Sequence, residues 1–472
     1  MRFLFTVIFC FLFALFAYAS TPTPLNGLKV PRSASLLSEY IQIRSLTGNE
    51  IEAGLYLKKL FTKSGLHTQV LTEDKDAYNI AASLYPLSMG KPNVIFLSHM
   101  DVVTANDTQL FTYPPFAGVI AEDNVWGRGA IDNKGMTIMQ FLATLHFLQQ
   151  AQKKDLPFNV TILVVSGEET GGERGAKIVT ESFFDLLNPV VAFGEGGSGM
   201  EGLIKRNPHQ KVFTIGVASK RPLWLELSLN TSSSGHSSVP PNNYPLQQKV
   251  IALEKVIAFN LDRELKFSET TKRMFKEIGK LEGGLRGLML KNLSTLSPIA
   301  KGYLKKNEIV YSVLSNTITI TSINTTNGEI NVIPNETKAT LDCRLLPGVS
   351  SASFIAELEK KLNNKDISIK ILKEGPAADE TVPDHFYDYT KQALEEVYPD
   401  TKVISLLFPA SDDNNYFRAK GVPVYGIMPT FLSRSQLESI HSINERIPIS
   451  CLEKGIQVYI KILQSIFDKA PH

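Results

Sequence analysis

The stretch NVIFLSHMD, residues 93–101, joins a continuous apolar run to polar residues that follow it directly. An apolar run of this length is typical of a strand that is buried on both faces, as in a parallel sheet. Residues 159–165 and 189–193 have the same character, and apolar residues at helical spacing fill residues 136–151. Strands that alternate with helices predict an α/β domain with a mostly parallel sheet.

A different pattern occupies the middle of the chain. Apolar and polar residues alternate with period two in residues 223–229, 317–321 and 337–343, which predicts half-exposed antiparallel strands. Two helical segments, 246–259 and 350–362, are long enough to cover one face of such a sheet. We therefore predict a catalytic domain that is interrupted by an inserted α+β domain. The expected boundaries are 20–217 and 375–472 for the catalytic domain and 218–374 for the insert.

The bulk composition is that of an ordinary globular protein. The 472 residues are 43% hydrophobic and 20% charged, which is enough apolar material for more than one core. The formal net charge of +2 gives no indication of nucleic acid as a partner. Two cysteines lie outside the N-terminal region, Cys343 and Cys451, and their apolar surroundings suit either a disulfide or two buried thiols.

The N-terminus has the pattern of a secretory signal peptide. Arg2 precedes an apolar run at residues 3–16, and Ala17-Tyr18-Ala19 has the small-x-small form of a cleavage site. We expect residues 1–19 to be removed and the mature chain to be secreted or periplasmic, with no membrane span left. The alternative is an uncleaved anchor, for which the apolar run is short.

Side chains of the types that bind metal ions follow three of the predicted strands. They are His99, the pair Glu168 and Glu169, and Glu195, which follows the strand expected to end at Phe193. Because the carboxyl ends of parallel strands meet at one rim of a sheet, we expect these side chains to lie together.

Asp132, in a Gly-rich turn, and His441, near the C-terminus, complete a set with the composition of a two-metal hydrolytic site. Two divalent cations and one spare carboxylate are enough to activate water against an amide. Imidazole with carboxylate oxygens suits zinc, with cobalt or manganese as substitutes. Taken singly, a histidine at a strand end is usually a satisfied hydrogen-bonding residue, and a glutamate pair is usually solvated surface. The combination favours the metal site.

Four motifs carry a resemblance to a known family. They are HMD (99–101), WGRGAIDNKG (126–135), SGEETGG (166–172) and HSINER (441–446). In this order and spacing the chain resembles the M20 family of co-catalytic zinc metallopeptidases and amidohydrolases. PPF (114–116) and SGHSSVP (234–240) are most similar to the branch of carboxypeptidase S and the N-acyl-amino-acid hydrolases. The resemblance implies that the insert is a lid or dimerisation domain. It leaves both a homodimer and a monomer open, because the family contains both.

The resemblance also implies a role for each residue of the site. Two zinc ions per subunit would be held, one by His99, Asp132 and Glu195 and the other by Asp132, Glu169 and His441. Asp101 would hydrogen-bond His99 and fix its tautomer. Glu168 would be the general base that takes a proton from water and returns it to the leaving nitrogen.

The inserted domain supplies three further candidates. From the residues alone His236 is a solvated loop histidine, whereas the resemblance implies that it stabilises the developing oxyanion, often in the active site of the partner subunit. Asn331 resembles an asparagine that assists in the same pocket. Arg344 either grips a substrate carboxylate or forms an ion pair with Asp342.

Two features set this chain apart from the family pattern. Asn415 stands where many members have an arginine, so recognition of a substrate carboxylate would differ from that of strict carboxypeptidases. Residues 267–306 are rich in Lys and Leu and helical in pattern. Such an extension either widens the pocket for long acyl chains or caps the domain.

We therefore predict a secreted di-zinc hydrolase that cleaves a peptide bond or an N-acyl amide bond next to a free carboxylate. Its substrate would be a small peptide or an N-acyl amino acid. One alternative is an N-acyl-amino-acid hydrolase that also runs the condensation in reverse with long acyl chains. The other is a catalytically idle zinc-binding scaffold, against which the intact Glu168 and the full ligand set argue.

Overall fold

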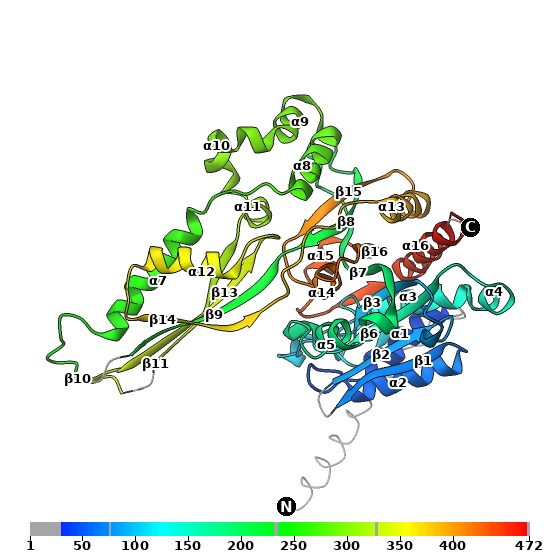
Figure 1. Ribbon diagram of the computed structural model, residues 1–472, viewed down its shortest axis with the longest axis horizontal. Helices are drawn as coiled ribbons and strands as arrows, with labels where there is room; N and C mark the ends of the chain where they lie inside the picture. Colours follow the sequence, from blue (N-terminus) through cyan, green and yellow to red (C-terminus); the bar gives the residue numbers. More distant parts are fainter. Residues whose placement is uncertain (1–29, 75–76, 231–234, 326–328, 470–472) are drawn as a thin grey trace, which may run out of the picture.

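The computed structural model describes residues 30–74, 77–230, 235–325 and 329–469. Figure 1 shows two parts, an α/β domain built from both ends of the chain and an elongated sheet with helices, built from its middle, that projects from this domain. The predicted signal peptide lies outside the described residues. None of the helices in the described ranges is long and apolar enough to cross a membrane.

An eight-stranded sheet forms the centre of the α/β domain. In spatial order its strands are β1 (His67–Asp74), β2 (Ala77–Ser83), β6 (Asn159–Val165), β3 (Asn93–His99), β7 (Pro189–Met200), β16 (Val424–Phe431), β8 (Lys211–Ser219) and β15 (Thr401–Phe408). The four neighbouring strands β6, β3, β7 and β16 run parallel to one another, and β8 runs parallel to β15. The pairs β1–β2, β2–β6 and β16–β8 are antiparallel. The predicted α/β class with a mostly parallel central sheet is confirmed.

Helices cover both faces of this sheet, because its strands are apolar on both sides. In β3, Val94 and Phe96 join one core, whereas Ile95 and Leu97 join another. The helices on the first face are α1 (Arg32–Gln42), α2 (Ile51–Lys63), α3 (Lys134–His146), α13 (His385–Val397) and α16 (Ile449–Asp468), and those on the second are α5 (Ala176–Ser182), α6 (Phe184–Leu187) and α14 (Asn414–Arg418). The helix predicted at 136–151 divides at Phe147 into α3 and α4 (Leu148–Lys153).

The second sheet has four antiparallel strands and one covered face. Its order is β11 (Thr317–Thr325), β13 (Glu336–Leu345), β9 (Arg221–Asn230) and β14 (Ile367–Glu374). The inward side chains of β9, Leu223, Leu225 and Leu227, pack beneath α7 (Pro245–Leu261) and α12 (Ser351–Leu362). Two short strands, β10 (Gly235–His236) and β12 (Val332–Ile333), pair at the far tip of this sheet (Figure 1).

Residues 269–314 form four helices that lead back to the central sheet. They are α8 (Glu269–Glu282), α9 (Gly284–Lys291), α10 (Leu293–Leu304) and α11 (Glu308–Leu314). Met274 and Phe275 of α8 pack against Leu407 of the edge strand β15, and Glu277 accepts a hydrogen bond of 2.9 Å from the backbone amide of Ser405. The helical extension therefore covers an otherwise open sheet edge.

The remaining elements are short. They are the three-stranded sheet of β17 (Arg446–Pro448), β5 (Asn124–Trp126) and β4 (Val119–Ala121), helix α15 (Arg434–Leu437), and the 3-10 turns η1 (Leu87–Met89), η2 (Thr108–Leu110) and η3 (Glu168–Thr170). The chain passes between the two large sheets twice, from β8 to β9 and from β14 onward. Cys343, in β13, and Cys451, in α16, are buried free thiols, so of the two alternatives the structure has the thiols.

Candidate metal centre

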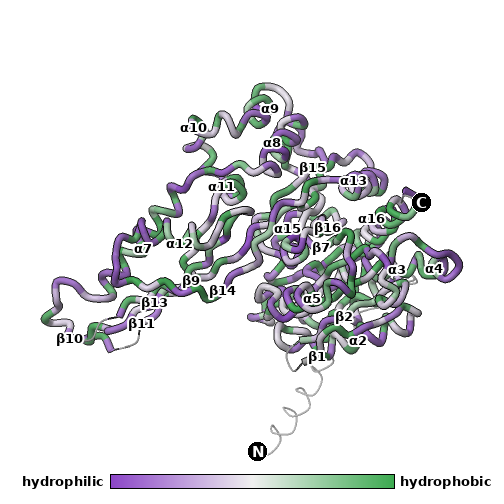
Figure 2. The backbone as a smooth tube through the Cα atoms, in the orientation of Figure 1, coloured by the Kyte–Doolittle hydropathy of each residue, from purple (hydrophilic) through white to green (hydrophobic). Residues whose placement is uncertain are grey.

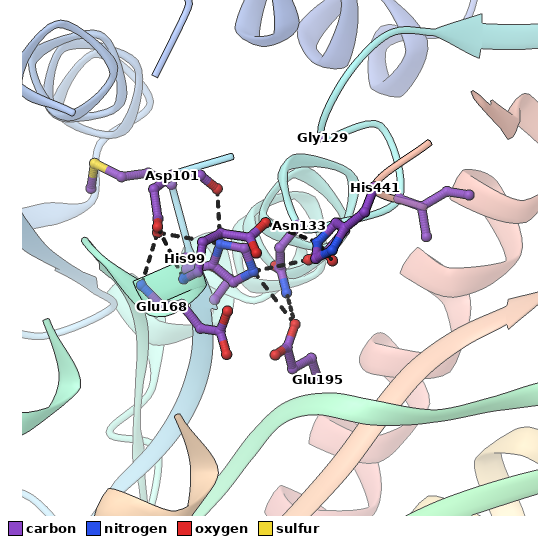
Figure 3. A network of polar contacts seen from close by, with 12 residues as sticks. His99, Asp101, Gly129, Asn133, Glu168, Glu195 and His441 are labelled. Carbon is purple, nitrogen blue, oxygen red and sulfur yellow. Dashed lines mark hydrogen bonds and ion pairs between the residues drawn. The ribbon is translucent and has the colours of Figure 1, made fainter. Parts of the chain in front are cut away.

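The predicted metal ligands converge on one rim of the central sheet. His99 is the last residue of β3, and Glu168 and Glu169 stand in η3, directly after β6. Asp132 lies in the turn before α3, and His441 lies in the turn after α15. Figure 3 shows His99, Glu168 and His441 in one cluster, although they come from three separate segments of the chain.

Two groups of three ligand atoms form around Asp132. Its Oδ1 lies 3.0 Å from Nε2 of His99, and its Oδ2 lies 3.0 Å from Nε2 of His441. Glu195 approaches the same nitrogen of His99 at 3.5 Å, and Glu169 approaches that of His441 at 3.1 Å. Within each group the candidate ligand atoms lie within 4.8 Å of one another. Since each oxygen of Asp132 faces a different imidazole, this carboxylate could contribute one oxygen to each of two cation sites.

Glu195 lies within β7, which corrects the expectation that the strand ends at Phe193. The register between β7 and β16 shifts between Gly426 and Ile427, so Glu195 and Gly196 are extra residues in β7. Such a bulge bends a strand and changes the direction of its side chains. A local irregularity of the strand, rather than its end, thus brings Glu195 to the cluster.

Asp101 ties His99 to the turn that carries Glu168. Nδ1 of His99 lies 2.9 Å from the backbone carbonyl oxygen of Asp101 and 3.5 Å from its carboxylate. A proton on Nδ1 is therefore held by the carbonyl, which leaves Nε2 free to bind a cation. The carboxylate of Asp101 accepts hydrogen bonds of 3.1 Å from the backbone amides of Glu168 and Glu169, and one from Thr47. It positions η3 more directly than it orients the imidazole.

Glu168 lies beside the cluster and belongs to neither group of ligand atoms. Burial, together with the neighbouring carboxylate of Glu195, raises the pKa of Glu168 well above its ordinary value. The recess next to Glu168 is lined by Pro222 and Gly375, where the chain passes between the sheets, and by Tyr416. A carboxylate that is not a ligand thus stands where the two parts of the molecule meet.

The charges of the cluster fit divalent cations. Hydrogen bonds with Asp132 and Glu169 raise the pKa of His441 to about 10. Burial opposes protonation of His99, but hydrogen bonds with neighbouring carboxylates raise its pKa well above the ordinary value. Burial also disfavours the charged form of Asp132, yet both imidazoles lower its pKa. Imidazole nitrogens and carboxylate oxygens at this spacing form a donor set that suits two zinc ions.

Glu445 and Arg128 hold the turn that carries Asp132, and our sequence-based predictions did not include this role. Both side chains are buried and form an ion pair of 2.7 Å. Glu445 also accepts hydrogen bonds from the backbone amides of Gly129, Ile131 and Asp132. Both residues lie inside the quoted motifs, but their pairing joins segments more than 300 residues apart. Their opposite charges were the only signal in the sequence.

Two asparagines fix Glu195. Asn133 donates a hydrogen bond of 2.8 Å to its carboxylate, and Asn414 of α14 donates one of 2.8 Å to its backbone carbonyl. A Cβ at Gly194 would clash with Asn414, which explains the glycine before Glu195. Outer contacts of this kind orient metal ligands and tune their affinity.

His236 and Asn331 lie apart from the metal cluster. His236 forms β10 at the tip of the second sheet, away from the central sheet (Figure 1). It is exposed, and its Nδ1 lies 2.7 Å from the hydroxyl of Ser238. The backbone carbonyl of Asn331 accepts a hydrogen bond from Ser237, so the two predicted residues lie together. Within one chain they do not join the metal ligands.

Arg344 forms the ion pair that the sequence offered as one alternative. Its Nε and Nη2 donate hydrogen bonds to the carboxylate of Asp342 at 2.9 and 3.0 Å, and its Nη1 donates to Ser411 at 2.7 Å. Asn415 is buried and accepts hydrogen bonds from Ser219 and Arg418. Both residues are engaged in contacts where the two sheets join.

The sequence and the fold of this chain are similar to those of known proteins. Residues 95–465 match the model of peptidase family M20/M25/M40. The chain belongs to this family. It is 24% identical over 427 residues to the N-fatty-acyl-amino acid synthase/hydrolase PM20D1.1 of Danio rerio, covering 88% of this chain and 80% of that protein. It is also 24% identical to the probable carboxypeptidase S-like 2 of Dictyostelium discoideum, covering 79% and 71% of the two chains.

A solved structure shares the whole fold. The M20 family metallo-carboxypeptidase Sso-CP2 from Sulfolobus solfataricus superposes with a TM-score of 0.68 at 20% identity, over 92% of this chain and 99% of that one. The predicted family and its enzyme class, a peptidase or amidohydrolase of the M20 type, are confirmed.

Proposed function

We propose that this M20 enzyme is a secreted di-zinc hydrolase that cleaves a peptide bond or an N-acyl amide bond next to a free carboxylate. The observation that carries the proposal is the pair of ligand groups that share Asp132, with Glu168 left free beside them. His99 and Glu195 would complete one metal site, and Glu169 and His441 the other. The same side chains would hold cobalt or manganese as substitutes.

Two bound zinc ions would lower the pKa of water and polarise the amide carbonyl. The carboxylate of Glu168 would accept a proton from the attacking water. It would then deliver this proton to the leaving nitrogen. Asp101 would hold the backbone of Glu168 in place through the amide hydrogen bond described above. In this proposal a single chain supplies the residues that move the proton.

His236 and Asn331 would stabilise the oxyanion from a second subunit. Their place at an exposed tip supports this, since residues of a catalytic type stand there without a metal ligand near them in the same chain. A homodimer that exchanges these tips would complete two equal sites. Arg344, bound to Asp342, would contribute to substrate binding only if a substrate carboxylate replaced this partner.

A second candidate is the hydrolysis and synthesis of N-acyl amino acids with long acyl chains. The relative from Danio rerio, which is named for this activity, supports it. Asn415 supports it as well, because an asparagine in place of the family arginine weakens a strict carboxypeptidase assignment. The two candidates share the metal centre and differ in the substrate pocket.

The test is hydrolysis of a panel of dipeptides and of short- and long-chain N-acyl amino acids, with bound metal counted. We expect the wild type to hold two zinc ions per subunit and to cleave one class of substrate. The Glu168→Ala variant should keep its metal and lose nearly all activity. A wild type that binds metal but cleaves nothing beyond what Glu168→Ala cleaves would favour the idle scaffold.

A further inference from the structure

Helix α9 buries a glycine and exposes its large apolar side chains. Gly287 is the buried residue of α9, and it lies against Gly279 of α8, where an added Cβ would stand 2.6 Å from the carbonyl oxygen of Gly287. The two backbones therefore touch, with no side chain between them. Of the leucines of α9, Leu290 packs against the core beneath α8, whereas Leu285 and Leu288 stay exposed.

The outward face of α9 is strongly apolar. Leu285, Leu288 and Met289 are 76%, 57% and 50% exposed, and Ile299 of α10 is 90% exposed. Single exposed apolar residues are common, but a group of them on neighbouring helices marks a surface that binds a partner. Figure 2 shows that both α9 and α10 contain hydrophobic residues. These four residues are called the α9–α10 patch below.

The helices around this patch are basic. Residues 269–306 contain nine Lys and Arg and three Asp and Glu, a net charge of +6, whereas the whole chain is +2 and the remainder is thus −4. Lys276, Lys280 and Lys291 are exposed. The α9–α10 patch therefore lies in a segment whose net charge is strongly positive.

A cavity of about 300 Å³ lies beside the patch. Phe267, Phe275 and Leu290 contribute apolar surface to it. Its charged lining consists of four cations, Lys272, Arg273, Lys276 and Lys291, and one carboxylate, Glu269, which pairs with Lys272 at 2.7 Å. An apolar wall with cations at its rim suits an anionic amphiphile, which has an apolar chain and a charged head.

We propose that α8, α9 and α10 bind the surface of a membrane that contains anionic lipids, with the α9–α10 patch inserted among the acyl chains. Charge complementarity favours this occupant over a second copy of the chain, because a symmetric dimer through this patch would bring two surfaces of like charge together. Since the opposite side of α8 packs on β15, binding would hold the catalytic domain near the bilayer. The proposal does not depend on the hydrolytic function.

The test is co-sedimentation with vesicles of phosphatidylcholine alone and of phosphatidylcholine mixed with phosphatidylglycerol. The form beginning at Ser20 is used because the apolar run at residues 3–16 would itself enter a bilayer, and all described elements lie after residue 29. We expect binding to the mixed vesicles that weakens with salt. Lys276→Glu/Lys280→Glu should weaken it roughly thirtyfold or more, and Leu288→Ser/Met289→Ser roughly tenfold or more.

Matched controls lie elsewhere on the surface. Lys58→Glu/Lys59→Glu, on exposed positions of α2, and Val382→Ser, 77% exposed, should leave binding unchanged. Circular dichroism and activity in solution report whether each variant folds. Binding that is equal for both vesicle types, absent from both, or unaffected by the patch variants would overturn the proposal. So would a dimer that Leu288→Ser/Met289→Ser dissociates without any vesicle binding.

Discussion

The metal cluster and the tip of the second sheet both carry side chains of catalytic types, but their surroundings differ. At the cluster, buried strands and paired loops hold each side chain through several contacts, as Asp101 and Glu445 do. At the tip, His236 is exposed and contacts the hydroxyl of Ser238. Both groups of candidate metal ligands lie within one chain, whereas the described residues of the tip include none of these ligands. In the proposed function, the residues of the tip are the part of the active site that a second subunit would supply.

Removal of the carboxylate of Asp132, the proposed bridge, should have the largest effect. Asp132→Ala takes one ligand from each group, and we expect the variant to lose both cations and its activity to fall by on the order of a thousandfold or more, because metal polarisation contributes several kcal/mol to the barrier. Mass spectrometry measures the bound metal, and initial rates measure the activity. Asp366→Ala, an exposed carboxylate of the second sheet region, should behave like the wild type. Full activity in Asp132→Ala would contradict the shared site.

A change at the tip should reduce the rate but leave the metal in place. We expect His236→Ala to lose roughly a hundredfold in kcat, the effect of removing one group that stabilises an oxyanion, with two cations still bound. Metal content and kcat are measured on the same sample.

Mixing two inactive variants tests whether the tip acts across subunits. If His236 of one subunit serves the site of the other, exchange between His236→Ala and Glu168→Ala subunits should restore about a quarter of the wild-type rate, because half the dimers are mixed and each has one intact site. A mixture that stays inactive although mixed dimers form would place His236 outside the partner's site.

The fold could be predicted from the sequence because its strands differ in periodicity. The continuous apolar run at residues 159–165 predicts a strand with the same bounds as β6. The period-two runs predict the strands of the second sheet, which is covered on one face. The end of β7 was misjudged because the glycines after Phe193 resemble a turn, whereas they form a bulged strand. A bulge depends on the register of the neighbouring strand, which one sequence does not show.

The candidate metal ligands could be predicted from their motifs. The residues that hold the backbone around these ligands could not. Glu445 accepts hydrogen bonds from three backbone amides near Asp132, and backbone donors leave no trace in the side-chain pattern. For the same reason the contact between Asp101 and the amides of η3 was missed. Nor could the sequence place His236 relative to the cluster, because that distance depends on how far the second sheet projects.

Loss of the Arg128–Glu445 ion pair should lower activity less than loss of a metal ligand does. We expect Glu445→Gln to lower metal affinity and activity about 10- to 100-fold, the range for residues that orient ligands, because it removes the charge opposite Arg128 while keeping an acceptor. Titration with zinc under a competing chelator measures the affinity. Glu438→Gln, on an exposed glutamate of the same segment, is the control. Equal affinity in both variants would show that the pair does not position Asp132.

The smallest effect is expected at Glu50, which is buried before α2 near η3. Burial raises the pKa of Glu50 from 4.5 to about 7. Glu50 therefore holds a proton more tightly in the folded protein than in the unfolded chain. Its contribution to the free energy of unfolding falls as pH rises through 4.5 and levels off above 7. Glu50→Gln removes this loss. The difference in free energy of unfolding between Glu50→Gln and the wild type should therefore grow in favour of the variant by about 2 kcal/mol from about pH 5 to about pH 8.

Urea unfolding at several pH values measures this gain. Glu52→Gln, an exposed position of the same helix, should follow the wild type throughout. A constant difference between Glu50→Gln and the wild type at every pH would refute a buried, titrating Glu50.

The shared Asp132 is tested most directly by anomalous diffraction at the zinc edge from crystals of the zinc-loaded protein. We predict two peaks in each subunit, one next to His99 and Glu195 and one next to Glu169 and His441, with the carboxylate of Asp132 between them. A single peak, or zinc bound away from Asp132, would contradict the two-metal centre.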